Sequence, residues 1–250
     1  MKNPGLMIVL LLLAAGAALG LFGARAFLKA PPPAPGISSA PGEAAPALPA
    51  NLPPLDRSDD FVRLRASGLS AAPAFAEWLK QESLIPRLAA AMSMIANGKF
   101  PRETFAAFAP RGKFAVVKKG GKTFVDPAGY ARYDAFAALV SGVDAVAAAK
   151  LFEELEPLLD LAHRELGEKT AGARATFLAA AAELLEAPRL EDGVLLKEGK
   201  KGIGWVYADE ELENRSLAQK QLMRMGPKNQ SAVQAKLRAV TLALGNSVGR

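Results

Sequence analysis

The chain has 250 residues, of which 50% are hydrophobic, and it contains one histidine and no cysteine. A chain of this length forms one or two domains and has enough apolar residues for a sizeable core. The lack of cysteine excludes disulfides, thiolate zinc sites, iron–sulfur clusters and cysteine nucleophiles. A single histidine excludes a multi-histidine metal site within one chain. We therefore expect no cofactor.

The net charge of +6 is unevenly distributed along the sequence. Residues 151–213 carry 7 basic and 15 acidic side chains, whereas residues 214–250 carry 7 basic and no acidic ones. A chain with separated charges can bind an external polyanion, or its basic tail can pair with its own acidic middle. Because the two blocks nearly balance, the pattern favours internal pairing.

An uncharged apolar stretch, GLMIVLLLLAAGAALGLFGA, occupies residues 5–24. As a helix it spans about 30 Å, which matches the hydrocarbon core of a bilayer. A cleaved signal peptide has a shorter apolar core of about 7–15 residues, so we predict an uncleaved signal anchor in residues 1–29. Cleavage near Ala24-Arg25-Ala26 is the alternative. We expect a single-pass protein of a bacterial inner membrane, with its N-terminus in the cytoplasm and its folded domain in the periplasm.

Small residues recur every four positions within this segment, at Gly16, Gly20 and Ala24. Such spacing permits close contact between two membrane helices and hence a homodimer, although an Ala/Gly-rich anchor also produces it by chance.

Residues 30–54 follow the anchor. They are rich in Pro and Ala, and Glu43 is their only charge. This composition buries too little surface to offset its ordering entropy, and it predicts a disordered, semi-extended tether.

Residues 55–245 are predicted to form a single globular domain, mostly helical, followed by a tail of residues 246–250. Helical patterns cover residues 55–67, 71–80, 82–97, 101–110, 129–143, 144–167 and 170–188. Residues 112–127 and 193–209 read instead as two β-hairpins around Gly/Lys turns. The predicted fold class is therefore mostly α with two short β-hairpins (α+β), and the hairpins can pair into one small sheet.

The closing segment predicts a helical hairpin. Ser216 and Gln219 have the spacing of a capping box at the start of its first helix. Gly226 ends that helix, and Pro227 suits the first turn of the next. The second helix carries one apolar stripe that requires burial against a core, formed by Val233, Leu237, Val240 and Leu244.

Candidates for catalysis are few, because no phosphate-binding loop, dinucleotide-binding motif or nucleophile elbow is present. Glu153, Glu156 and Asp160 share a helix face, where they could hold Ca²⁺ or serve a hydrolase, although a solvated helix face gives the same pattern. The remaining candidates are Asp59, Asp60 and His163. A lone helical histidine is usually structural, so we predict no catalytic site.

Two groups of residues are candidates for a binding surface. Tyr130, Arg132 and Tyr133 could line a ligand groove, with residues at the edge of the core as the alternative. The second group is basic and consists of Lys220, Arg224, Lys228, Lys236 and Arg238. A DNA-reading helix–turn–helix would have a longer turn and more base-reading side chains, so we do not expect nucleic acid as a partner.

Four segments together resemble a family of bacterial proteins classed only as a domain of unknown function. They are LPPLDRSDDFVR, IANGKFPR, FVDPAGYARYD and AQKQLMRMGPKNQSAVQAKLR, in that order. The resemblance covers about residues 51–241 and implies single-pass envelope proteins with a Pro/Ala-rich tether. It implies no activity, cofactor or substrate. In this family a proline tends to follow the serine that here is Ser216, where this chain has Leu217.

We therefore expect a non-catalytic, membrane-anchored envelope protein whose tethered domain binds a protein partner or a cell-wall polymer. One alternative is an envelope hydrolase that uses carboxylates or His163. A second is a binder of anionic lipid or another polyanion through the basic C-terminal helices.

Overall fold

The computed structural model describes residues 48–68, 70–167, 172–191, 193–199 and 204–247. The predicted signal anchor, the small-residue spacing within it and most of the predicted tether lie outside these residues. Within the described ranges, no single helix has the length and hydropathy of a membrane span, although the bent pair Pro127–Ser141 and Ala145–Glu165 passes that test when the two are taken together.

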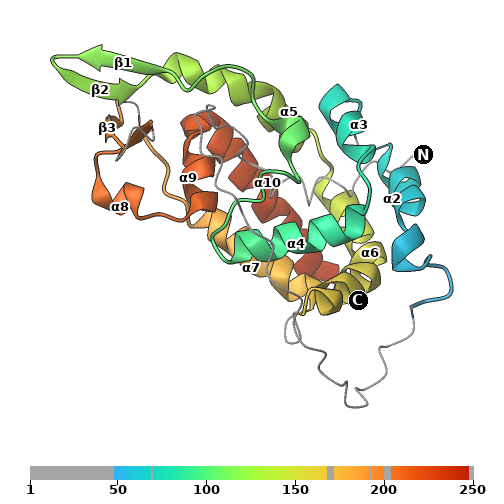
Figure 1. Ribbon diagram of the computed structural model, residues 1–250. Helices are drawn as coiled ribbons and strands as arrows, with labels where there is room; N and C mark the ends of the chain where they lie inside the picture. Colours follow the sequence, from blue (N-terminus) through green and yellow to red (C-terminus); the bar gives the residue numbers. More distant parts are fainter. Residues whose placement is uncertain (1–47, 69, 168–171, 192, 200–203, 248–250) are drawn as a thin grey trace, which may run out of the picture.

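Four helices form the centre of the folded part: α4 (Leu84–Ala96), α6 (Ala145–Glu165), α7 (Ala173–Leu185) and α10 (Gly226–Ser247). α4 contacts α6 and α7, and α10 contacts α5 (Asp134–Ser141), α6 and α7 (Figure 1). The predicted apolar stripe of α10 is buried in this core, with every member at most 1% exposed: Val233, Leu237, Val240 and Leu244. Burial of a full stripe, rather than helix propensity, stabilises the C-terminal helix.

Carboxylates at helix starts position several of these elements. At the start of α6, Asp144 accepts a hydrogen bond from the backbone N–H of Ala147 at 2.6 Å. Asp59 lies in α2 (Asp59–Ala66) but caps α4, because its oxygens accept from the backbone N–H groups at residues 83 and 84, at 2.7 and 2.8 Å. Ser58 immediately precedes α2, but its side chain does not cap that helix. It instead donates its hydroxyl to the carbonyl of Leu55 at 2.8 Å.

The predicted hairpins form one antiparallel sheet with the order β1-β2-β3-β4. Its strands are β1 (Val116–Lys119), β2 (Lys122–Val125), β3 (Leu195–Glu198) and β4 (Trp205–Tyr207). Gly120 and Gly121 adopt positive φ in the first turn, as the hairpin pattern requires. The sheet lies at the end of the molecule opposite α2 (Figure 1). The prediction of a mostly helical fold with a small antiparallel sheet is confirmed.

The remaining elements are short, and most of them connect the long helices. They are η1 (Leu55–Arg57), α3 (Pro73–Leu79), η2 (Ala106–Phe108), η3 (Pro127–Tyr133), α8 (Glu210–Glu213) and α9 (Leu217–Met223). α3 contacts η2, and η3 leads directly into α5. The two that matter most for the candidate site are η3 and α9.

Candidate functional site

The predicted groove residues of η3 lie against the corner between α9 and α10. The backbone turns at this corner because Gly226 adopts φ +78°. A Cβ on Gly226 would lie 2.4 Å from ring atoms of Tyr130, so only glycine leaves room for that ring. The Nδ2 of Asn229 donates to the carbonyl of Tyr130 at 3.1 Å and to the Oδ1 of Asp134 at 2.9 Å. These contacts hold η3 on α10.

Tyr133 is a core residue and not the wall of an open groove, since it is 2% exposed. The guanidinium of Arg132 lies 4.9 Å from the centre of the Tyr133 ring and 5.4 Å from that of Phe114. Its Nη2 also donates to the Tyr133 hydroxyl at 3.3 Å. Burial raises the pKa of Tyr133, and the positive charges of Arg132 and Arg224 oppose this shift.

Tyr207 of β4 belongs to the same cluster, and sequence reasoning missed it. Burial raises the pKa of Tyr207, Arg224 opposes the shift, and Tyr130 and Tyr133 are close enough to add to it. The chain has three tyrosines, and the fold gathers all three around one arginine. The scarcity of tyrosine was the only sequence signal, because no local spacing links β4 to η3.

The five basic candidates do not form one free surface. The Nζ of Lys220 donates to the carbonyl and to the Oε1 of Glu213, both at 2.7 Å. The Nζ of Lys236 donates to the carbonyl of Val143. Lys228 and Arg238 are exposed on α10. Pairing of the basic residues 214–250 with the acidic residues 151–213 is thus observed at Lys220. The carboxylates of the acidic helix α6 pair instead with cations of other helices.

Those cations come from α2 and α7. Glu156 of α6 accepts from Arg174 of α7 at 2.6 Å, and Glu153 lies 3.5 Å from the same guanidinium. Asp160 accepts from the backbone N–H of Ala173 at 2.6 Å and so caps α7. Glu154 pairs with an arginine of α2 at 3.0 Å. The three predicted carboxylates therefore share a face, as expected, but they bind protein groups.

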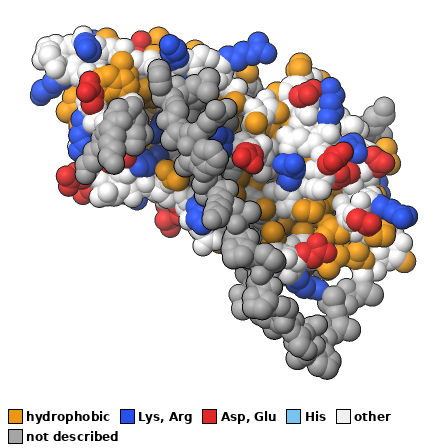
Figure 2. Space-filling model, in the orientation of Figure 1, with side chains coloured by type: hydrophobic (Ala, Val, Ile, Leu, Met, Phe, Trp, Pro, Cys, Tyr) orange, Lys and Arg blue, Asp and Glu red, His pale blue; other side chains and the backbone are white. Residues whose placement is uncertain are grey.

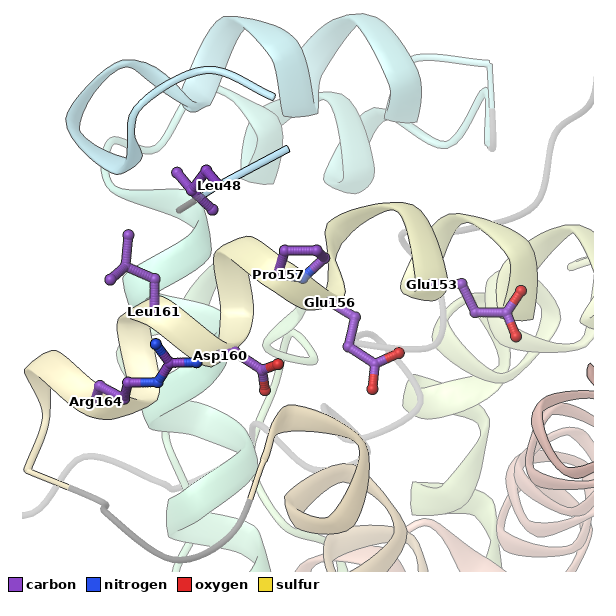
Figure 3. Close-up of a pocket in the computed structure, with 7 residues that line it drawn as sticks. All are labelled: Leu48, Glu153, Glu156, Pro157, Asp160, Leu161 and Arg164. Atoms are coloured by element: carbon purple, nitrogen blue, oxygen red, sulfur yellow. The ribbon is translucent and has the colours of Figure 1, made fainter. Parts of the chain in front are cut away.

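A pocket of about 360 Å³ lies along this face of α6 (Figure 3). It is lined by Leu48, Glu153, Glu156, Pro157, Asp160, Leu161 and Arg164. In the part of the chain that the structure describes, no group of three or more His, Asp or Glu side chains is arranged to hold a metal ion.

The other catalytic candidates also have structural contacts. His163 is 1% exposed, and its Nδ1 donates to the carbonyl of Leu159 one helical turn earlier at 2.8 Å. A substrate in solvent does not reach a side chain at this depth. Asp59 caps α4, and Asp60 pairs with Arg63 at 2.8 Å on the surface.

Three glutamines of the C-terminal segment bind the C-terminal end of α7. Gln219 donates to the carbonyl of Glu183 at 3.0 Å, and Gln230 and Gln234 each donate to that of Ala187 at 3.1 Å. These carbonyls have no partner within the helix itself. The predicted capping box is therefore half formed: Ser216 accepts from the N–H of Gln219 at 3.0 Å, but the side chain of Gln219 turns to α7 instead.

Comparison with known proteins gives one match. A family model described as "Protein of unknown function (DUF3014)" matches residues 84–241. This range contains the pocket-lining helix, the tyrosine cluster and the glutamines that bind α7. No curated protein matches the chain, and no solved structure does either.

Proposed function

The chain belongs to the DUF3014 family, and we propose that it is a non-catalytic, membrane-anchored envelope protein whose tethered domain binds a protein partner or a cell-wall polymer. The observation that supports the absence of catalysis is the use of the candidate catalytic side chains. Asp59 and Asp160 each cap a helix, Glu156 holds Arg174, and His163 is inside the core. A hydrolase would instead bring a base and an acid together in an accessible cleft.

The proposed location is supported by the sequence of residues 5–24, whose length and hydropathy suit a single bilayer crossing. Fusions of alkaline phosphatase and of a cytoplasmic reporter after residue 30 test it. We expect activity from the phosphatase fusion alone, because this enzyme matures outside the cytoplasm. Activity from the cytoplasmic reporter alone would contradict the envelope location.

Binding is tested by photocrosslinking in intact cells, with the crosslinking residue placed on an exposed site of the folded part and the captured material identified by mass spectrometry. We expect an envelope protein or a cell-wall fragment in covalent linkage. Capture of nothing but further copies of the chain would contradict the proposal, since it indicates a structural oligomer.

A further inference from the structure

Three lysines form a row across the outer face of the sheet. Lys119 of β1 lies opposite Lys122 of β2 in the strand register. The pairing of β2 with β3 places Thr123 opposite Leu196, so one residue further along Lys122 lies opposite Lys197. Neighbouring strands are about 4.8 Å apart, so the three lysines start from one line of backbone positions across three strands and extend from the same face.

An apolar row runs beside this lysine row. Residues two apart on a strand share a face, so Val117, Phe124 and Leu195 point to the same side as the lysines. The opposite face rests on the core and carries Val125, Leu196 and Tyr207, which are 4%, 6% and 4% exposed. On the outer face Leu195 is 37% exposed, and Val117 and Phe124 are half-buried.

The lysine row is unfavourable for the sheet by itself. Like charges directly opposite each other on adjacent strands destabilise the pairing. None of the three lysines makes an ion pair or a side-chain hydrogen bond with another residue that the structure describes, and all three are exposed. In the space-filling view, Lys and Arg side chains lie at the end of the molecule that carries the β1–β2 hairpin, together with hydrophobic side chains and some Asp and Glu side chains (Figure 2). An external anion would relieve this repulsion.

We propose that the outer face of the sheet, formed by the lysine row and the apolar row, binds a linear polyanion whose charges are phosphates. This inference rests on the proposed function and narrows its partner to a phosphate-bearing cell-wall polymer. Lysine ammonium groups bind phosphate as compact point charges. The apolar row offers the polymer backbone a dry surface beside the charges.

The size of the face decides against a globular protein. Four strands about 4.8 Å apart and four residues of about 3.3 Å each give roughly 250 Å², far below the roughly 800 Å² per partner of a stable protein interface. The tip of the first hairpin is Gly120-Gly121, so it has no apolar side chain to insert into a bilayer. An extended polymer chain lying across the strands fits the small area of the face and needs no apolar side chain at the hairpin tip.

The position of the sheet agrees with such a partner. The described chain begins at Leu48, near α2, and the sheet lies at the opposite end of the folded part (Figure 1). With the anchor at residues 5–24, as proposed, the tether joins the folded part far from the sheet, which leaves the sheet free to reach the rest of the envelope.

The test uses the full-length protein in detergent and a fluorescent linear inorganic polyphosphate as the probe. We expect binding whose log Kd changes with log salt with a slope near 2, because three lysines neutralise about three phosphates at about 0.7 per charge. Between about 50 and about 200 mM salt the affinity then falls roughly twentyfold. The variant K119Q/K122Q/K197Q should lose most of this slope, whereas K119R/K122R/K197R should keep it.

Two further variants control for overall charge and for the competing surface. K80Q/K99Q/K150Q removes three exposed lysines elsewhere and should leave the slope unchanged. K228Q/R238Q removes the exposed cations of α10 and should also leave it unchanged. Circular dichroism should show that K119Q/K122Q/K197Q is folded and at least as stable as the parent, because its like-charge row is gone.

Several results would overturn the inference. The first three are no binding of polyphosphate, an unchanged salt slope in K119Q/K122Q/K197Q, and loss of the salt slope in K228Q/R238Q. The other two are tighter binding of a length-matched oligo(dT) than of polyphosphate, and binding only to phosphatidylglycerol vesicles. If polyphosphate fails to bind while crosslinking still captures an envelope partner, the inference falls and the proposed function stands. If the reporter fusions place the domain in the cytoplasm, the proposed function falls whatever the binding result.

Discussion

Substitution of Gly226 by alanine tests whether the contact between α10 and Tyr130 holds the C-terminal corner together. The residue has φ +78°, and the added Cβ would lie 2.4 Å from the Tyr130 ring. The left-handed backbone costs about 1–2 kcal/mol for a residue with a Cβ, and forcing the ring aside costs about 1–3 kcal/mol more. We therefore expect a loss of roughly 2–5 kcal/mol, a large part of the 5–15 kcal/mol typical of a domain.

The assay is urea denaturation of the full-length protein in detergent, followed by circular dichroism. Gly112→Ala is the matched control, because Gly112 also has positive φ, +91°, but nothing lies within 4 Å of its added Cβ. The control should show the backbone contribution alone. In a Tyr130→Ala background, the loss of stability caused by Gly226→Ala should fall to that of the Gly112→Ala control. The difference between the two backgrounds gives a coupling energy of about 1–3 kcal/mol. Equal losses at Gly226 and Gly112, or no coupling to Tyr130, would refute the reasoning.

Other predictions follow from the hydrogen bonds and the buried hydroxyls. Gln234→Leu should destabilise the protein by about 0.5–1.5 kcal/mol in the same assay, because the carbonyls of Leu184 and Ala187 each lose one of their donors; an unchanged midpoint would contradict this. Asp59→Ala should cost about 1–2 kcal/mol by uncapping α4, and the loss should be absent if α4 needs no cap from α2. Burial raises the pKa of Tyr207 above its unfolded value of 10.0, so the folded state holds the proton that the unfolded state releases, and stability should fall as pH rises above about 10. In Tyr207→Phe this decline should be shallower by up to about 1.4 kcal/mol per pH unit, and an identical decline would exclude this tyrosine as its source.

Local patterns predicted most of the elements of the fold, although residues 101–110 hold only the short η2 and α8 was not predicted. The apolar stripe from Val233 to Leu244 and the Gly120-Gly121 turn are short-range signals, and both predictions are confirmed. The pairing of the two hairpins was an open expectation, because β2 and β3 are separated by about seventy residues of helix. Side-chain partners were harder to predict. Gln219 bonds to α7 and not back to Ser216, since unpaired carbonyls of another helix lie within its reach.

The candidate site could be predicted only in part, for the same reason. The spacing of Tyr130 and Tyr133 marked them as unusual, but the partner that encloses them, Gly226, is almost a hundred residues away. Tyr207 carried no signal beyond the scarcity of tyrosine in the chain. Individual lysines were visible as charges, whereas the row across the sheet depends on the register between β2 and β3. The pattern of residues within a single strand does not predict the register between β2 and β3.

The glutamines that bind α7 have a consequence for the order in which the chain is made. Of the described helices, α10 is the last to leave the ribosome, yet it supplies Gln230, Gln234 and the stripe that covers α5, α6 and α7. A nascent chain that has reached only α9 lacks the donors of Gln230 and Gln234 for the end of α7, and α10 does not yet cover α5, α6 and α7. We therefore expect the folded part to complete its core only after α10 has been released.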